Sequence, residues 1–372
     1  MIYKAFQQEQ LSALGLGAMR LPTTPDGTID KAAAAEMVAF AMENGINYYD
    51  TAWGYHNGQS EPVMGELLSA YPRESFKLAS KFPGYDLANM GKVAEIFEKQ
   101  LERCRVDYFD FYLFHNVCEM NIDGYLDPAN GIYDYLMEQK RKGRIRHLGF
   151  SAHANLDTMR RFLEAYGKDM EFCQLQINYL DWTFQDGKEK IDLVSEYGIP
   201  VWIMEPLRGG KLANLGEEHK AALQCIRNES LPAIAFRFLQ AIPQVVVTLS
   251  GMSNMAQLKE NVAIFAENKP LNGADFDRIL GVAADMLKNV VPCTSCRYCT
   301  EYCPNGLDIP RLIKLYNEHA FTGGGFIAPM ALSRVEADKQ PSACIGCGSC
   351  EAVCPQNIKI SEVMADFTRR LK

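Results

Sequence analysis

The sequence has no long apolar run and no excess of basic residues, and each absence excludes a class of protein. No stretch approaches the roughly 18 apolar residues that a membrane-spanning helix needs, so no membrane attachment is expected. Acidic residues outnumber basic ones by 46 to 38, and this net charge of −8 argues against a nucleic acid partner, whose phosphates would be repelled. The first 16 residues include a polar run where a signal peptide needs apolar residues, which predicts a cytoplasmic location.

Short strand-forming apolar runs alternate with helical patterns over residues 12–267. The eight runs cover residues 14–18, 46–50, 77–81, 109–115, 146–151, 173–178, 200–205 and 245–249. Helical patterns between them cover residues 30–44, 89–103, 131–141, 155–166, 188–197 and 254–267. Eight strands alternating with helices over this length predict an α/β fold of the closed (β/α)8 (TIM) barrel type. The alternative, a doubly wound open sheet, is weakened because no G-x-G-x-x-G sequence follows a strand.

Eight of the twelve cysteines form two copies of the pattern C-x2-C-x2-C-x3-C-P, which begin at Cys293 and Cys344. Disulfides are rare in a reducing cytoplasm, so clustered cysteines there indicate metal ligands. This spacing is typical of bacterial ferredoxins, in which three thiolates surround one cubane and the fourth reaches another. Zinc is the alternative, but a tetrahedral zinc site needs only two C-x2-C pairs and leaves the longer run unexplained.

The two motifs resemble those of two-cluster bacterial ferredoxins, and the resemblance implies a crossed set of ligands. One [4Fe–4S] cluster is expected on Cys293, Cys296, Cys299 and Cys354. The other is expected on Cys344, Cys347, Cys350 and Cys303. The remaining cysteines are interpreted as buried small hydrophobes: Cys104, Cys118, Cys173 and Cys225.

Near residue 288 the alternating strand and helix pattern gives way to the cysteine-rich segment, and this change divides the chain into two predicted domains. Residues 1–287 are expected to form the barrel, with a hairpin at residues 2–10 closing its bottom and a last helix at residues 274–286. Residues 288–372 are expected to form a small α-helical, ferredoxin-like iron–sulfur domain, with a helix at residues 309–319.

Four polar residues stand at or just beyond the C-terminal ends of the second, third and fourth predicted strands. They are Asp50, Tyr55, Lys81 and His115. Catalytic residues of barrel enzymes gather at this end of the strands. Reduction of a carbonyl by hydride needs a proton donor at the oxygen, and a tyrosine is a suitable donor when a neighbouring cation tunes its pKa. Each residue alone has an ordinary structural explanation, but the set of four predicts catalysis.

The segments that carry these residues resemble the catalytic tetrad of the aldo/keto reductase family, and the resemblance extends over about residues 10–267. It implies an oxidoreductase that reduces a small aldehyde or ketone with NADP(H), or alternatively NAD(H). Tyr55 is then the general acid, Lys81 and Asp50 tune it, and a neutral His115 orients the carbonyl. The resemblance implies coenzyme contacts from Met19, Asp50, Ser151, Gln174, Met204, Leu207, Ser253, Gln257, Glu260 and Asn261.

The chain departs from the family pattern at the coenzyme positions. Met204 stands where many members place a tyrosine under the nicotinamide, which gives a softer thioether contact. Gly251 and Gln257 stand where some members have basic residues for the 2′-phosphate, which leaves Ser253 and Gln257 as its polar contacts. The resemblance does not define the substrate, because the loops of the barrel determine which carbonyl compound is bound.

The rival interpretation is an electron-transfer iron–sulfur protein whose barrel is a scaffold without turnover. The complete tetrad argues against it. Two roles are expected for the clusters. They either transfer electrons, in which case a ferredoxin-like protein is a possible partner, or they stabilise the C-terminal domain. The sequence contains no flavin-binding signature that would couple one-electron clusters to a two-electron hydride step. Candidate wall residues of the substrate pocket are Trp53, Phe82 and Trp182.

Overall fold

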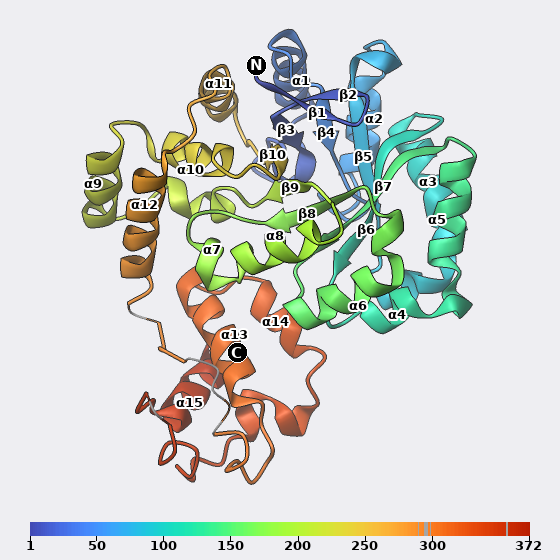
Figure 1. Cartoon of the computed structure of the whole chain (residues 1–372). Helices are drawn as coiled ribbons and strands as arrows, with labels where there is room; N and C mark the ends of the chain where they lie inside the picture. The colour runs from blue at the N-terminus through green and yellow to red at the C-terminus, as the bar shows by residue number, and fades with distance from the viewer. Residues whose placement is uncertain (289, 294–296, 298, 355) are drawn as a thin grey trace. The chain divides into compact units, whose positions relative to one another are not determined.

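The computed structural model describes residues 1–288, 290–293, 297, 299–354 and 356–372 (Figure 1). The chain divides into two compact units, Met1–Ala283 and Ala284–Lys372. The domain boundary that we place after residue 287 stays a prediction.

The first unit contains a closed barrel of eight parallel strands, which confirms the predicted (β/α)8 fold. Hydrogen-bonded neighbours follow the order β10-β3-β4-β5-β6-β7-β8-β9. The strands are β3 (Leu14–Gly17), β4 (Tyr48–Asp50), β5 (Lys77–Phe82), β6 (Phe109–Val117), β7 (Ile145–Ala152), β8 (Phe172–Gln176), β9 (Val201–Met204) and β10 (Val245–Ser250). All eight overlap the predicted runs, because buried parallel strands consist of nearly continuous apolar residues.

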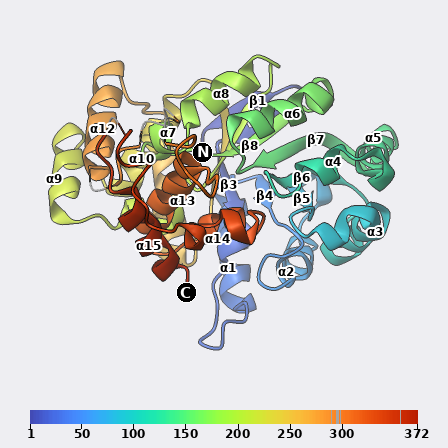
Figure 2. The ribbon, with the colours of Figure 1, turned by 90° about the horizontal axis from the view of Figure 1, so that it is seen from below.

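Helices surround the strands on the outside, as the view from below shows (Figure 2). The helices that follow the strands are α1 (Lys31–Glu43), α2 (Ser60–Leu68), α3 (Val93–Cys104), α5 (Ile132–Arg141), α6 (Leu156–Tyr166), α8 (Gly187–Ser195), α10 (Leu231–Gln240) and α11 (Met255–Ile264). Additional helices are α4 (Ile122–Leu126), α7 (Asp181–Phe184), α9 (Glu217–Ile226) and α12 (Gly273–Met286). A capping side chain begins some of them: in α1, the side chain of Asp30 accepts the backbone N–H of Ala33 at 3.0 Å.

An N-terminal hairpin closes one end of the barrel interior, as expected. Its antiparallel strands are β1 (Tyr3–Phe6) and β2 (Glu9–Ser12). Phe6 is buried in the same apolar cluster as Trp202 of β9, and their ring centres lie 4.9 Å apart. In the turn of the hairpin, Gln7 donates a hydrogen bond of 2.8 Å to Glu171, which directly precedes β8.

The second unit is helical, and its described motif cysteines lie outside the helices. Its helices are α13 (Ile309–Thr322), α14 (Ile327–Leu332) and α15 (Ile360–Arg370). Leu312, Met364 and Phe367 form part of its apolar core, in which Cys299 and Cys350 are also buried. Described cysteines of both motifs therefore lie in or against one hydrophobic cluster.

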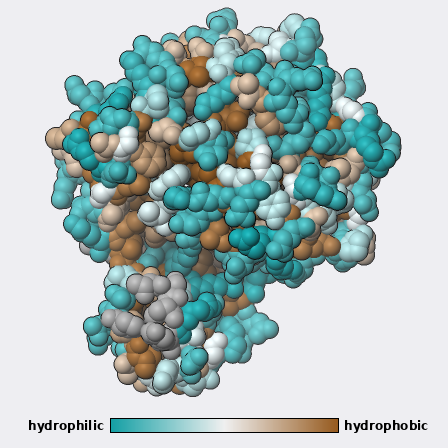
Figure 3. Space-filling view, in the orientation of Figure 1, coloured by the Kyte–Doolittle hydropathy of each residue, from teal (hydrophilic) through white to brown (hydrophobic). Residues whose placement is uncertain are grey.

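Polar residues cover much of one face of the first unit. Figure 3 shows hydrophilic side chains over most of its visible face, with hydrophobic residues scattered among them. Among the described residues, no helix combines the length and the apolar character that crossing a membrane requires.

Candidate active site

The structure brings the four predicted catalytic residues together at one rim of the barrel. Asp50 ends β4, Lys81 lies in β5 and His115 in β6, and these strands are adjacent and parallel. The ammonium nitrogen of Lys81 lies 2.5 Å from Oδ1 of Asp50 and donates to the carbonyl oxygen of Thr51 at 2.8 Å. The same nitrogen lies 5.0 Å from the ring centre of Tyr55, and the rings of Tyr55 and His115 are 6.0 Å apart.

Burial sets the protonation of this group. It lowers the pKa of Lys81 and raises that of Asp50, while the attraction between the two charges opposes both shifts. Burial, together with the negative charges of Asp50 and Glu205, raises the pKa of Tyr55 well above its ordinary value. Burial, assisted by the charge of Lys81, lowers the pKa of His115 well below its ordinary value. At neutral pH the tyrosine therefore keeps its proton and the histidine is neutral.

A second buried carboxylate, that of Glu61, lies close to Lys81 and was not predicted as a site residue. Oε1 of Glu61, in the first turn of α2, accepts hydrogen bonds from Ser80 at 2.7 Å and from Gln100 at 2.5 Å. The amide of Gln100 also donates to the carbonyl oxygen of Lys81 at 3.0 Å. These bonds fix β5 at the position of Lys81. In the sequence, Glu61 could have been found as an acidic residue shortly after Tyr55.

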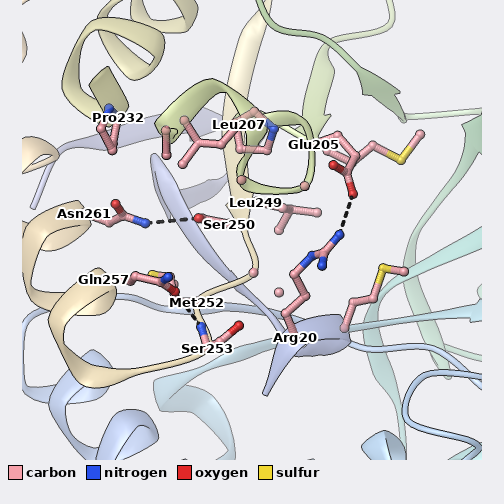
Figure 4. A pocket seen from close by; sticks show the side chains of 18 of the residues that line it. Arg20, Glu205, Leu207, Pro232, Leu249, Ser250, Met252, Ser253, Gln257 and Asn261 are labelled. Atoms are coloured by element: carbon pink, nitrogen blue, oxygen red, sulfur yellow. Dashed lines mark hydrogen bonds and ion pairs between the residues drawn. The ribbon is translucent and has the colours of Figure 1, made fainter. Parts of the chain in front are cut away.

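A pocket of about 440 Å³ begins at the tetrad and runs along the rim of the barrel to α11 (Figure 4). Nine of the predicted coenzyme contacts line it: Met19, Asp50, Gln174, Met204, Leu207, Ser253, Gln257, Glu260 and Asn261. Ser151 is not among its described lining residues, and its hydroxyl oxygen accepts the backbone N–H of Asn116 at 2.8 Å.

Gln174 gives the tetrad end of the pocket an acceptor that fits a nicotinamide. Its Oε1 is buried and has no hydrogen-bond partner among the described residues, while its amide nitrogen lies 3.8 Å from the sulfur of Met204. Buried polar atoms are nearly always paired. An amide donor such as the nicotinamide carboxamide would satisfy this oxygen.

An ion pair that the sequence analysis did not predict crosses the middle of the pocket. Arg20 follows β3, Glu205 follows β9, and Nη2 of Arg20 lies 3.6 Å from Oε1 of Glu205 (Figure 4). A Cβ on Gly251 would lie 3.1 Å from the arginine side chain, and one on Gly209 would lie 3.3 Å from its Nη2. Among the described residues that line the pocket, Arg20 is the one with a positive charge. In the sequence, Arg20 could have been found as a basic residue just after the first predicted strand.

The three candidate wall residues occupy different places. Trp182 packs edge-on against Phe238 and Phe276, and Phe82 is fully buried. Trp53 lines a hollow of about 320 Å³ beside the tetrad. The other residues that line this hollow are Gly54, Asn57, Gly58, Tyr85, Asp86, Asn89 and Arg103. Of the three, Trp53 is therefore the one that faces a space next to the site, since the ring of Tyr85 lies 5.1 Å from His115.

In the second unit, one hollow is lined by the four cysteines of a predicted cluster. They are Cys303 from the first motif and Cys344, Cys347 and Cys350 from the second. The backbone N–H of Leu307 donates to the sulfur of Cys303 at 3.4 Å, a bond suited to a thiolate ligand.

No group of three His, Cys, Asp or Glu side chains among the described residues is close enough to hold a single metal ion. A cubane does not require such convergence, since each of its four irons takes its own thiolate. The four cysteines around this hollow therefore offer the thiolate donors that a [4Fe–4S] cluster takes. Of the other predicted set, Cys293, Cys299 and Cys354 are described, and Cys296 lies outside the described residues.

Comparison with protein families finds both parts of the chain. Residues 13–284 match the aldo/keto reductase family, and residues 292–358 match the 4Fe-4S dicluster domain. The NADH-specific methylglyoxal reductase of Escherichia coli K12 is 26% identical, over 71% of this chain and 92% of its own length. The L-galactose dehydrogenase of Arabidopsis thaliana is 25% identical, over 74% of this chain and 90% of its own length.

Solved structures show the same barrel. An aldo-keto reductase from Bacillus halodurans, in its holo form, superposes with a TM-score of 0.63 at 25% identity, covering 76% of this chain and 96% of its own. An aldo/keto reductase from Klebsiella pneumoniae in complex with NADP and acetate superposes with a TM-score of 0.60 at 19% identity, covering 74% and 92%. The family match spans most of the chain and coincides with the barrel and its tetrad, and the chain therefore belongs to the aldo/keto reductase family.

Proposed function

We propose that this oxidoreductase reduces a small aldehyde or ketone by hydride transfer from a reduced nicotinamide dinucleotide, with Tyr55 as the general acid. The observation that carries the proposal is the enclosed Lys81–Asp50 pair beside the Tyr55 ring, at the end of a pocket of coenzyme size. The name of one relative agrees with it, because methylglyoxal is a small carbonyl compound.

The chain's own residues supply proton and orientation. When bound, reduced nicotinamide supplies a hydride to the carbonyl carbon. Tyr55 holds the proton that the carbonyl oxygen needs, because its raised pKa keeps it protonated. The ammonium of Lys81, 5.0 Å from the ring centre, is the positive charge next to the phenolate that forms. The neutral imidazole of His115 orients the carbonyl oxygen. One hydride and one proton convert the carbonyl into an alcohol, and Tyr55 then recovers its proton from solvent.

For the second unit we propose two [4Fe–4S] clusters on the crossed cysteine sets. Bound clusters exchange electrons one at a time, whereas the hydride step moves two together, so the carbonyl reaction does not require them. They serve either a ferredoxin-like electron partner or the structure of the unit. A cytoplasmic location is part of the same proposal, because clustered free thiolates suit a reducing compartment.

A second candidate, electron transfer with an idle barrel, is disfavoured because a scaffold has no need of the assembled tetrad. The test is anaerobic turnover of methylglyoxal and a panel of small aldehydes, followed by nicotinamide absorbance. Tyr55→Phe removes the proton donor but keeps the ring, so coenzyme binding should persist while kcat falls by at least about 100-fold. Near-normal kcat in this variant would show that Tyr55 is not the acid. Absence of turnover by the unmodified protein with every carbonyl would favour the idle barrel.

A further inference from the structure

We infer that Tyr85 limits the length of the substrate, because its side chain separates the carbonyl site from a neighbouring hollow. This inference rests on the proposed function. The hollow, of about 320 Å³, has no part in the mechanism above, and none of its described lining residues belongs to the tetrad. Gly54 and Tyr85 both line it, and both also lie against tetrad residues. The side chain of Tyr85 therefore decides whether the site and the hollow form one space.

Tyr85 bridges the two segments that carry the groups for the carbonyl oxygen. Its ring lies edge-on to the imidazole of His115, with 5.1 Å between the ring centres and an interplanar angle of 88°. Its hydroxyl lies over Gly54, which directly precedes Tyr55, since a Cβ on this glycine would be 2.3 Å from that oxygen. The rings of Tyr55 and His115 are 6.0 Å apart, and Tyr85 thus closes the gap between them on the side of the hollow.

Neighbouring contacts hold Tyr85 in this position. A Cβ on the preceding Gly84 would lie 2.3 Å from the hydroxyl oxygen of Tyr125, so the backbone here packs directly on that side chain. The same hydroxyl donates to the carbonyl oxygen of His115 at 2.7 Å. After Tyr85, the side chain of Asp86 caps the helical turn that follows and accepts a backbone N–H at 3.0 Å. The loop is therefore fixed relative to His115.

The hollow beyond Tyr85 is large enough to hold part of a substrate. Its volume falls within the range of about 300–1,000 Å³ that is typical of small-molecule pockets. The guanidinium of Arg103 lies 3.8 Å from the ring centre of Trp53, and both side chains line the hollow together with Asn57 and Asn89. With the coenzyme in the pocket on the other side of the tetrad, this hollow is a space into which a longer substrate can extend.

The barrier that Tyr85 presents is the bulk of a neutral ring. Burial, followed by the charges of Tyr55, Glu61 and Asp86, raises the pKa of Tyr85 to about 12, so the phenol keeps its proton near neutrality. A short substituent on the carbonyl carbon fits between the tetrad and this ring, whereas a longer one must displace the ring. The native site therefore selects short aldehydes and ketones.

The experiment compares two unbranched aldehydes, propanal and hexanal, with each reduced coenzyme, NADH and NADPH. The unmodified protein should have the higher kcat/KM for propanal. In Tyr85→Ala the hexanal-to-propanal ratio of kcat/KM should rise at least about 10-fold, because the longer chain gains the hollow. Tyr85→Phe keeps the ring and should leave the ratio within about 2-fold. Tyr108→Ala is the matched control, since Tyr108 is also half-buried but directly precedes β6, at the opposite end of that strand from His115.

A second set of variants tests the contact between Tyr85 and Gly54. Gly54→Ala places a Cβ 2.3 Å from the hydroxyl oxygen, so the ring must move and the ratio should change by at least about 3-fold. In Tyr85→Phe this oxygen is absent, and the ring carbon that carried it lies 3.3 Å from the same Cβ. Gly54→Ala should therefore change the ratio by less than about 2-fold in that background.

The possible results separate the inference from the proposed function. An unchanged ratio in Tyr85→Ala with propanal still reduced, or a preference of the unmodified protein for hexanal, overturns the inference and leaves the reductase intact. Absence of turnover of both aldehydes by the unmodified protein with either coenzyme overturns the proposed function and the inference with it. If Tyr85→Ala does not fold, the Gly54→Ala variants decide, because equal effects with and without the Tyr85 hydroxyl contradict the inference.

Discussion

Lys81 and Asp50, which are 31 residues apart in the sequence, form a 2.5 Å ion pair that is almost fully enclosed beside the ring of Tyr55. Two neighbouring parallel strands hold the partners, so the pair is as rigid as the barrel wall. A buried charge is stable only while its partner is present. The contact between Nζ of Lys81 and Oδ1 of Asp50 therefore matters both for catalysis and for the stability of the fold.

Removing one partner of this pair should harm stability more than removing both. Asp50→Asn leaves the Lys81 ammonium without its counter-ion, and the cost is expected to be about 3–5 kcal/mol of unfolding free energy. Asp50→Asn/Lys81→Met should recover part of that loss while carbonyl reduction stays low. Thermal unfolding and steady-state kinetics on the three variants check this. A double variant less stable than Asp50→Asn would contradict the pairing.

The reduction rate should depend little on pH around neutrality. Tyr55 has a pKa well above its ordinary value and stays protonated, and His115 has a pKa well below its ordinary value and stays neutral. We therefore expect constant kcat/KM for reduction from about pH 6 to 9, and alcohol oxidation that rises with pH as Tyr55 loses its proton. A reduction profile with a step near pH 6.5 that vanishes in His115→Gln would show a titrating histidine.

Glu171 should make the hairpin end of the barrel sensitive to acid. Burial raises its pKa, but hydrogen bonds from His147, Lys140, Gln7 and the Leu148 N–H outweigh this and lower the pKa to about 2. The folded form thus favours the carboxylate, and this stabilisation is complete above pH 4.5 and is lost as the pH falls from there toward 2.

Glu171→Gln should accordingly lower the free energy of unfolding by about 1–3 kcal/mol at pH 7 and by much less near pH 3. Denaturant unfolding at the two pH values is the measurement. Glu164→Gln on the exposed side of α6 is the control and should be nearly neutral at both. A pH-independent difference for Glu171→Gln would contradict the cited pKa.

Crossed ligation predicts that Cys303 serves the cluster of the second motif. Anaerobically prepared protein should hold about eight irons, and Cys303→Ser should damage the cluster on Cys344, Cys347 and Cys350. Paramagnetic resonance of the reduced protein distinguishes the two clusters. Loss confined to the first motif's cluster would exclude the crossing, and bound zinc without iron would exclude clusters altogether.

The barrel reaction should continue after the clusters are lost. Every residue assigned to proton transfer or coenzyme binding lies in the first unit, so protein with oxidatively destroyed clusters should keep most of its carbonyl turnover. Stopped-flow absorbance under anaerobiosis should show no rapid cluster bleaching by NADPH without a mediator. Bleaching within the turnover time would establish direct electron exchange between the two parts.

The sequence was sufficient for the barrel and the tetrad, because both follow from local patterns repeated at strand ends. Contacts that form only when the barrel closes could not be predicted from the sequence. Arg20 and Glu205 meet only because β3 and β9 both flank β10. Trp182 stands near a strand end but packs on Phe238 and Phe276, a choice that only the packing of the outer helices determines. Helix α10 was also missed, and nearly all of its residues are buried.

The ion pair between Arg20 and Glu205 has a consequence for how quickly the coenzyme arrives. The glutamate offsets the charge of the arginine, so this rim offers little attraction at long range to an approaching dianion. The chain as a whole carries a charge of −8, which repels the same molecule. Added salt screens such repulsion over about 10 Å at 0.1 M, and association should therefore accelerate with ionic strength, opposite to electrostatically steered encounters.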